Sequence, residues 1–409
     1  MELLQVDKLS EAIDKLYKEY SKGNHNIALE EVRVADSYGR ILAEDLCAEI
    51  SVPDFDRSTV DGYAVIAKNT EGANDTIPTF LNVIGESKMG EECTLSIKDG
   101  ECVYVPTGGM VPKGADACVM IEHTESITSE KIAVYDSVAS GKSLIKRGDD
   151  IKKGDVALSK GTKITEAEMG YMSSIGVDKV KVYKKWNITI ISTGDELVDS
   201  GSEYRLGKIR DINTYLLIGL SNRFGFNIVN KYLLKDEPKL LEDTITKSIK
   251  DSDVVVVSGG SSKGKKDASA VIIGKIASSG VLTHGIAIRP GKPTITAYDE
   301  VSDTFIIGLP GHPVASAVLF KLIVVAIYNR ITGNETKDLY VKGTMTENIP
   351  ASPGRMTFQL VNIDENLNVK PIFGRSGIVH TLVSADGYVI IDEDKEGINK
   401  GDIVKVYYL

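Results

Sequence analysis

The chain has 409 residues, and its 48 Lys and Arg against 58 Asp and Glu give a formal net charge of −10. This acidic balance argues against a general nucleic-acid binder, which needs a basic surface, and against docking to an anionic membrane. With 42% hydrophobic and 26% charged residues, the composition is that of a soluble globular protein, and the length suggests about three domains.

Residues that commonly ligate metals are few. The four cysteines show no C-x-x-C spacing and the five histidines are scattered, which argues against a structural zinc site or an iron–sulfur cluster. So few cysteines predict no disulfide scaffold, and the cytoplasm is the expected location. The first 20 residues are amphipathic rather than a signal peptide, and the apolar run 314–328 is interrupted by Lys321 and too short to span a bilayer.

The predicted elements change in character along the chain. Apolar residues at helical spacing predict a first helix over 6–20. From 47 to 154, short runs separated by Gly, Pro and Asp turns predict a β-rich domain. From Trp186, strands and helices alternate, which predicts a doubly wound α/β domain with a mostly parallel sheet covered on both faces. The tail 335–409 is again β-rich.

Three loops in the α/β region leave the carboxyl ends of predicted strands, where ligands bind in open α/β sheets. They are Ser192-Thr-Gly-Asp-Glu-Leu197, Ser258-Gly-Gly-Ser-Ser-Lys-Gly-Lys-Lys-Asp267, and Arg289-Pro-Gly-Lys-Pro293 with Gly308-Leu-Pro-Gly-His-Pro313 after the next strand. Asn213 is the expected N-cap of the helix that follows the first loop.

The second loop partly matches a P-loop. Gly259 and Gly264 with Lys265 have the P-loop spacing, but Lys266 stands where magnesium needs a Ser or Thr. A P-loop-like nucleotidase or kinase is therefore the weaker alternative. The glycines still let backbone N–H groups approach an anion, and the next helix N-terminus favours negative charge, so phosphate or a similar oxyanion is the expected guest.

The local charge supports an oxyanion. Between Ser258 and Pro293, six basic residues and one acid give a charge of +5 within a chain of −10. Arg289 and Lys292, fixed between prolines and a glycine, are the expected anion site.

The β-rich region adds three further blocks: Pro53-Asp-Phe-Asp-Arg-Ser-Thr-Val-Asp-Gly-Tyr-Ala-Val65, Pro106-Thr-Gly-Gly109 and Arg147-Gly-Asp-Asp150. Together with the three loops, and in the same order, these blocks resemble the molybdopterin molybdotransferase family, which includes MoeA and the E domain of gephyrin. The resemblance runs nearly the full chain. Each block is weak alone, whereas the ordered set is specific.

The resemblance implies a multidomain α/β plus β fold in an elongated homodimer. The implied parts are linker domain I (29–46 and 155–185), β-rich domain II (47–154), the molybdopterin-binding α/β domain III (7–28 and 186–334) and a C-terminal β-barrel-like domain IV (335–409). The active-site cleft would lie between the α/β domain and domain II of the partner subunit.

The resemblance also implies a reaction. Molybdenum from molybdate would be inserted into adenylylated molybdopterin with release of AMP, the final step of molybdenum cofactor biosynthesis, with Mg²⁺ as helper ion. The implied partners are the molybdopterin adenylyltransferase and other pterin-delivering proteins. Molybdate and tungstate are nearly isosteric, so the sequence does not choose between them. A non-catalytic scaffold of the same fold is the other alternative, since gephyrin's E domain also binds a receptor tail.

Residue roles follow from the matched motifs. The implied catalytic residues are Asp61, Asp150, Glu196 and Asp267, of which Glu196 and Asp267 would also hold magnesium. The implied cofactor-binding residues are Thr107, Asp236, Ser258, Gly259, Gly260, Arg289 and Lys292, with Arg289 and Lys292 as the oxyanion clamp. Carboxylates suit such a site because they can hold magnesium against a pyrophosphate and orient an attacking oxygen.

Three motifs depart from the family pattern. His312 replaces the Asn of Gly-Leu-Pro-Gly-Asn-Pro, and a core or cap role is expected for it. The glycine-rich loop reads Gly-Gly-Ser-Ser-Lys-Gly rather than Gly-Gly-Val-Ser-x-Gly. His380 and Thr381 stand where many members carry two serines, so no site residue is assigned in the tail.

Overall fold

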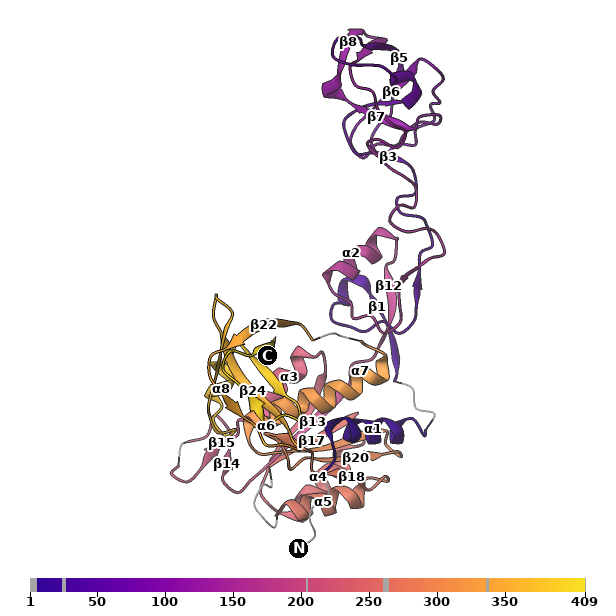
Figure 1. Ribbon diagram of the computed structural model, residues 1–409. Helices are drawn as coiled ribbons and strands as arrows, with labels where there is room; N and C mark the ends of the chain where they lie inside the picture. Colours follow the sequence, from indigo (N-terminus) through magenta and orange to yellow (C-terminus); the bar gives the residue numbers. More distant parts are fainter. Residues whose placement is uncertain (1–5, 24–26, 204, 260–264, 336–337, 409) are drawn as a thin grey trace.

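The computed structural model describes residues 6–23, 27–203, 205–259, 265–335 and 338–408, without the side chains of residues 265–267. The molecule is elongated (Figure 1). An α/β domain and a β-barrel lie together at one end, a small β domain lies at the other, and a narrow part connects the two ends.

The α/β domain is built on a six-stranded sheet. From edge to edge its strands are β16 (Asn227–Leu234), β13 (Asn187–Thr193), β17 (Val254–Gly259), β21 (Thr304–Leu309), β20 (Ile295–Asp299) and β18 (Val281–His284). Within this sheet only β20 runs against its neighbours, so the expectation of a mostly parallel sheet is confirmed. The chain goes from β13 to β16 on one side and then to β17 on the other, so the strand order reverses between β13 and β17.

Helices cover both faces of this sheet because side chains alternate along its buried strands. Val254 and Val256 of β17 face one core, and Val255 and Val257 face a second core. The first core is covered by α1 (Leu9–Tyr20), α3 (Asn213–Arg223) and the helix Pro313–Thr332, and the second by α4 (Pro238–Ser248) and α5 (Lys265–Ile276). The doubly wound arrangement expected from the sequence is confirmed.

The helix ends follow the sequence signals with one exception. Pro238 stands in the first turn of α4, and Gly225, with φ of +79°, follows the end of α3. The exception is Asn213, whose expected role as N-cap is wrong because it is already the first helical residue of α3. Instead, the carboxylate of Asp211 accepts a hydrogen bond from the Thr214 backbone N–H at 3.1 Å.

The last helix of the α/β domain is longer than the apolar run seen in the sequence. It consists of α6 (Pro313–Leu319), a π-helical segment η4 (Phe320–Val325) and α7 (Ala326–Thr332). By length and composition alone these 20 residues could cross a membrane. Leu319, Phe320 and Ile323 are instead buried in the first core, and this burial explains why the helix is apolar.

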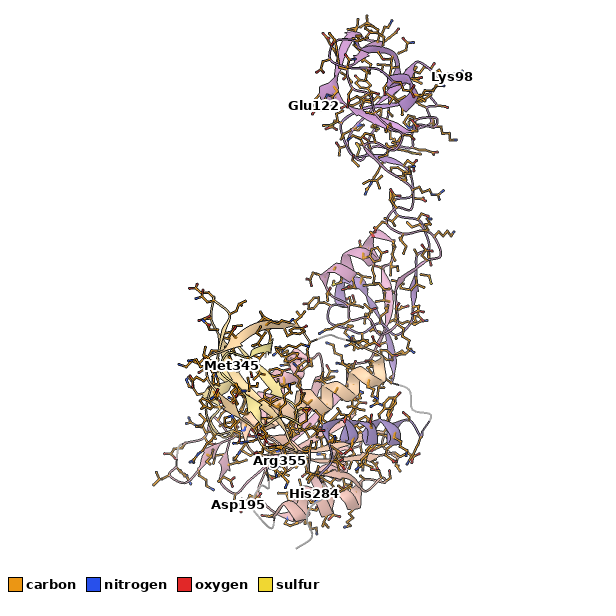
Figure 2. The ribbon with its side chains drawn as sticks, in the orientation of Figure 1. Lys98, Glu122, Asp195, His284, Met345 and Arg355 are labelled. Atoms are coloured by element: carbon orange, nitrogen blue, oxygen red, sulfur yellow. The ribbon has the colours of Figure 1, made fainter. Side chains whose placement is uncertain are left out.

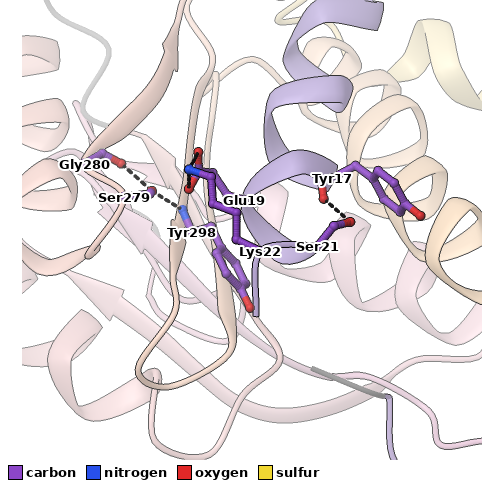
Figure 3. A network of polar contacts seen from close by, with 7 residues as sticks. All are labelled: Tyr17, Glu19, Ser21, Lys22, Ser279, Gly280 and Tyr298. Atoms are coloured by element: carbon purple, nitrogen blue, oxygen red, sulfur yellow. Dashed lines mark hydrogen bonds and ion pairs between the residues drawn. The ribbon is translucent and has the colours of Figure 1, made fainter. Parts of the chain in front are cut away.

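The helix α1 belongs to the α/β domain although it comes first in the chain. Its Leu16 and Tyr20 are buried in the first core, and the Tyr20 ring meets the Tyr298 ring edge-on, with centroids 6.1 Å apart. Figure 3 shows the end of α1 near Tyr298, whose backbone N–H donates to Ser279 Oγ at 3.0 Å. Ser279 Oγ in turn donates to the Gly280 carbonyl at 2.9 Å.

The narrow part is formed where the chain leaves the α/β domain and where it returns. The backbone N–H of Lys184 donates to the Ala28 carbonyl at 2.8 Å and so joins the outgoing segment to the returning one. The elements of the narrow part are the antiparallel pair β1 (Leu29–Arg33) and β12 (Lys179–Tyr183), η1 (Val34–Asp36), α2 (Glu166–Ser174), and the pair β2 (Leu46–Cys47) and β11 (Val156–Leu158).

The small β domain confirms the β-rich expectation for this region. Its sheet runs in the order β7 (Ala117–Met120), β4 (Gly62–Val65), β6 (Glu101–Val105), β5 (Thr79–Glu86), β9 (Lys131–Val134) and β8 (Thr124–Thr128), with β3 (Arg57–Ser58) paired to β10 (Leu144–Ile145) and the short helices η2 (Ala67–Thr70) and η3 (Ile121–His123). Burial raises the pKa of the Cys102 thiol to about 12, so this cysteine stays protonated and serves packing.

The C-terminal part is a closed five-strand barrel. Its strands follow the order β24 (Met356–Ile363), β25 (Asn368–Pro371), β22 (Tyr340–Met345), β28 (Ile403–Tyr408) and β26 (Gly387–Ile391), and β26 pairs again with β24. Smaller elements are the pair β23 (Ile349–Pro350) and β27 (Gly397–Ile398) and the single turn α8 (His380–Val383). The strand β19 (Ile288–Arg289) of the preceding region pairs in parallel with β24, which joins the barrel to the α/β domain.

A partly buried carboxyl, Asp253, lies just before the interior strand β17 and makes stability depend on pH. Burial raises the pKa of Asp253, and the charge of Asp303 raises it further, although the Asn187 backbone N–H donates to Asp253 Oδ2 at 2.6 Å. A carboxyl whose pKa is raised on folding favours the folded state while protonated, so this contribution is lost as pH rises through the raised pKa.

Asp253→Asn is therefore expected to stabilise the protein at neutral pH relative to wild type. The difference in Tm between variant and wild type should grow as pH rises above about 4, the ordinary pKa of an Asp carboxyl, toward neutral pH, and should level off above the raised pKa. Thermal unfolding followed by circular dichroism across this range measures it. Asp251→Asn, at a neighbouring exposed position, is the control and should follow the wild-type profile. A constant Tm difference across the range would contradict the burial argument.

Candidate active site

The carboxyl ends of β13 and β17 meet where the strand order reverses, which is the expected ligand position in such a sheet. Thr193 lies opposite Gly259 in the register of the two strands. Gly259 has φ of +123°, and a Cβ placed on it would lie 2.1 Å from the Thr193 carbonyl oxygen. Only glycine therefore allows the two strand ends to stay this close while the chain turns away.

A buried polar network lies directly behind these strand ends. Ser192 Oγ donates to Asp211 Oδ1 at 3.2 Å, and Thr214 Oγ1 donates to Asp211 Oδ2 at 2.6 Å. Ser192 Oγ and Thr214 Oγ1 are also 2.9 Å apart. Sequence reasoning missed Asp211, although an acid before a helix start is a recognisable capping signal. The network fixes the start of α3 against the end of β13.

The loop after β13 brings two expected acids toward each other. The Asp236 backbone N–H donates to Asp195 Oδ1 at 3.1 Å, so the loops that carry Glu196 and Asp236 are in contact. The first loop leads into β14 (Leu197–Val198), which pairs in parallel with β15 (Ile209–Arg210). The exposed Glu196 carboxylate makes no hydrogen bond or ion pair within the described part of the chain.

Three cations lie at the junction of the α/β domain and the barrel. Arg289 pairs with Thr357 in the β19–β24 register, which places Arg355 of the barrel beside the Arg289 segment. Arg289 and Arg355 are exposed and Lys292 is half-buried. Among the described residues none of the three forms an ion pair, so their charge is available to an anion. Sequence reasoning found Arg289 and Lys292 but missed Arg355, because only the strand pairing brings it here.

The structure places Asp61 and Thr107 together in the small β domain. The Thr107 backbone N–H donates to Asp61 Oδ1 at 2.7 Å, and both residues are exposed. The Asp61 carbonyl accepts from the Ile121 backbone N–H at 2.9 Å, which fixes this loop to the sheet. Asp150 is exposed at the junction with the narrow part, where its charge raises the pKa of Tyr171 in addition to the effect of burial.

Within one chain the expected site residues fall into two distant groups. Figure 2 shows Asp195 and Arg355 at one end of the molecule and Glu122, next to the Asp61 loop, at the other end. This separation is what the expected cleft requires, because that cleft would combine the α/β domain of one subunit with domain II of its partner.

Two expected residues lie outside the described part of the chain. Gly260 is not described, and of Asp267 only its backbone position in the first turn of α5 is described. The same applies to Lys265 of the P-loop alternative. Among the described residues no three His, Cys, Asp or Glu side chains cluster as they would around a metal ion.

Two of the three departures from the family pattern have local structural roles, and the third, in the glycine-rich loop, lies outside the described residues. His312 is the N-cap residue of α6, but its side chain makes no capping hydrogen bond and is neither buried nor in a core. Its Nδ1 lies 2.7 Å from Ser376 Oγ of the barrel, so it links the two domains. His380 Nε2 lies 3.1 Å from Ser384 Oγ, and Thr381 Oγ1 donates to the Ile378 carbonyl at 2.7 Å.

Comparison with known proteins finds related families along nearly the whole chain. Family models match the MoeA N-terminal region (domain I and II) at residues 6–176, a "Probable molybdopterin binding domain" at 189–330 and the MoeA C-terminal region (domain IV) at 342–409. The molybdopterin molybdenumtransferase of Bacillus subtilis is 31% identical, with 92% of this chain and 88% of that protein covered.

Further relatives cover nearly the full length. The molybdopterin molybdenumtransferase of Staphylococcus epidermidis is 30% identical, with 97% of this chain and 94% of that protein covered. The crystal structure of a molybdopterin biosynthesis MoeA protein from Pyrococcus horikoshii superposes with a TM-score of 0.81 at 30% identity, with 99% of this chain and 100% of that chain covered. With this fold, these strand-end loops and these relatives, the chain belongs to the MoeA family of molybdopterin biosynthesis proteins.

Proposed function

We propose that this protein inserts molybdenum from molybdate into adenylylated molybdopterin and releases AMP, the final step of molybdenum cofactor biosynthesis. The observation that carries the proposal is the cation group Arg289, Lys292 and Arg355 beside the strand ends of a molybdopterin-binding domain. Unpaired cations at such a position suit a phosphate or molybdate oxyanion. The relatives named molybdopterin molybdenumtransferase support this reaction.

The residues of the site fit magnesium as a helper ion. Mg²⁺ is usually held by one or two carboxylates together with substrate phosphates, so a dense cluster of acids is not required. Glu196 is exposed and unpaired among the described residues, and Asp267 stands in the first turn of the helix after the glycine-rich loop. The ion would neutralise phosphate charge as the AMP group departs.

The complete site requires two copies of the chain in this proposal. The small β domain, which carries Asp61 and Thr107, lies too far from the α/β domain of the same chain for the two to share a substrate (Figure 1). In a homodimer, the small β domain of one subunit would reach the strand ends of its partner. The adenylyltransferase that makes the adenylylated pterin, other pterin-delivering proteins and a cytoplasmic location belong to the same proposal.

The decisive experiment is an AMP-release assay with purified protein, magnesium, molybdate and adenylylated molybdopterin. AMP is expected in amounts equal to the molybdenum inserted. The Bacillus subtilis relative serves as the positive control. If the relative turns the substrate over and this protein leaves it intact, the proposal fails. ATP hydrolysis without this reaction would instead favour the nucleotidase alternative, and binding without turnover would favour the scaffold.

A further inference from the structure

Asn213 is a buried polar residue for which the expected roles give no explanation. It is 8% exposed at the start of α3. Its Nδ2 donates to Ser258 Oγ at 2.7 Å and to the Gly311 carbonyl at 2.9 Å. One side chain therefore connects the end of β17 to the loop that follows β21, and both segments border the candidate active site.

The orientation of the Asn213 amide is fixed by its neighbours. The Gly311 carbonyl can only accept a hydrogen bond, so the amide atom facing it must be nitrogen. Oδ1 then points elsewhere, and it is buried without a hydrogen-bond partner among the described residues. Native proteins pair nearly all buried acceptors, because an unpaired one loses its bonds to water without compensation.

Ser258, which accepts a hydrogen bond from Asn213, offers an unused donor where Asn213 offers an unused acceptor. The residue is 1% exposed, and its Oγ accepts from Asn213. Its hydroxyl proton has no acceptor among the described contacts. The pair therefore offers one acceptor, Asn213 Oδ1, and one donor, the Ser258 O–H. A fully deprotonated oxyanion such as molybdate has only acceptors and can satisfy the serine alone, whereas a ring edge or a ribose diol can satisfy both.

We propose that Asn213 and Ser258 together bind a donor–acceptor edge in the organic part of the adenylylated pterin, rather than its phosphates or molybdate. This assignment rests on the proposed function and deepens it. Asn213 Oδ1 accepts from an N–H or O–H of the ligand, and the Ser258 hydroxyl donates to the adjacent acceptor. The cofactor-binding role expected for Ser258 is thereby specified as recognition of the pterin, the adenine or the ribose by its side chain.

Calorimetric titration with AMP, 6-hydroxymethylpterin phosphate and molybdate tests the assignment. Asn213→Ala is expected to weaken binding of AMP or of the pterin phosphate about tenfold, the effect of about 1.4 kcal/mol for one hydrogen bond. Ser258→Ala should weaken the same probe, and the probe affected identifies the part of the substrate that is bound. Molybdate affinity should stay within about twofold in both variants. Asn222→Ala, an exposed position on the same helix, is the control and should leave all three affinities unchanged.

Two results would overturn the assignment. One is an equal loss for molybdate and the organic probes, which would indicate general distortion of the site. The other is unchanged affinity for every probe. If the wild-type protein binds none of the probes, the proposed function itself fails and the assignment fails with it.

If Asn213→Ala does not fold, titration of the wild-type protein with modified probes tests the assignment instead. 2′-Deoxy-AMP, purine riboside 5′-monophosphate and ring-methylated pterin phosphates each lack one donor group of a parent probe. At least one of them is expected to bind about tenfold more weakly than its parent. Equal affinity of all analogues and parents would overturn the assignment.

Discussion

Asp61→Asn and Arg289→Ala are each expected to lower AMP release about 100-fold or more. Mixed dimers that contain one chain of each variant are expected to regain activity. Asp61→Asn removes the charge but keeps an oxygen for the Thr107 N–H. Arg289→Ala removes an exposed cation that has no partner among the described residues. Both substitutions should therefore leave the fold intact and change the site alone.

Recovery in the mixture follows from the distance between the two groups in one chain. A mixed dimer contains one site with both groups native and one site with both altered. Random assembly makes about half of the dimers mixed, so about a quarter of all sites are complete before purification and about half of the sites in the purified mixed dimers. Co-expression with two affinity tags and AMP-release measurement on the doubly purified dimer test this expectation. Two differently tagged Asp61→Asn chains serve as the control and should stay inactive.

The outcome separates two arrangements of the site. If the site were built within one chain, every site in the mixed dimer would carry one altered group, and the sample would remain as inactive as its parents. If both single variants kept full activity, Asp61 and Arg289 would have no part in the reaction.

Gly259→Ala is expected to abolish AMP release because the substitution forces the two strand ends apart. The added Cβ would lie 2.1 Å from the Thr193 carbonyl oxygen, and a φ of +123° is strained for any residue with a side chain. Over-packing of this kind costs about 1–3 kcal/mol and shifts the backbone. A shift of about 1 Å at a reacting group can cost about 100-fold in rate.

The matched control for Gly259→Ala is Gly219→Ala in the middle of α3. No atom within 4 Å would meet the new methyl group at Gly219. Alanine should even stabilise this helix by about 0.5–1 kcal/mol relative to glycine. Tm and AMP release measured on both variants give the comparison. Wild-type activity in Gly259→Ala would show that the approach of the strand ends is not needed for the reaction.

The sequence predicted the fold well wherever local patterns are strong. Buried strands such as Val254–Gly259 stand out because four consecutive valines need a sheet covered on both faces. The start of α3 differs from the prediction because Asn213 and Asp211 are both good capping residues. Asp211 makes the local bond to the Thr214 N–H, whereas Asn213 bonds to the distant Ser258, which the sequence does not show. The order of strands in the sheet likewise depends on long-range packing.

For the candidate site, the sequence motifs identified the loops that form it but not the residues from distant segments that lie beside them. Arg289 and Lys292 stand in one short motif, whereas Arg355 comes close only through pairing of β19 with β24. The unpaired oxygen of Asn213 is invisible in a sequence, because it depends on the Gly311 carbonyl nearly a hundred residues later. The resemblance implied a cleft between two subunits, and the structure adds that the small β domain and the α/β domain of one chain lie far apart (Figure 1).

The hydrogen bond between Ala28 and Lys184 determines which part of the chain can be expressed as a separate folded unit. Residues 29–183 leave the α/β domain and return to it, and the residues that flank this segment, Ala28 and Lys184, are joined by a hydrogen bond of 2.8 Å. Excising this segment and rejoining the two ends through a short turn would leave the α/β domain with its own first helix in place. By contrast, a fragment that simply begins at Trp186 would lack α1 and expose the apolar surface that Leu16 and Tyr20 cover. The natural unit for expression is thus discontinuous in sequence, as in a domain that acquired its outer arm by insertion.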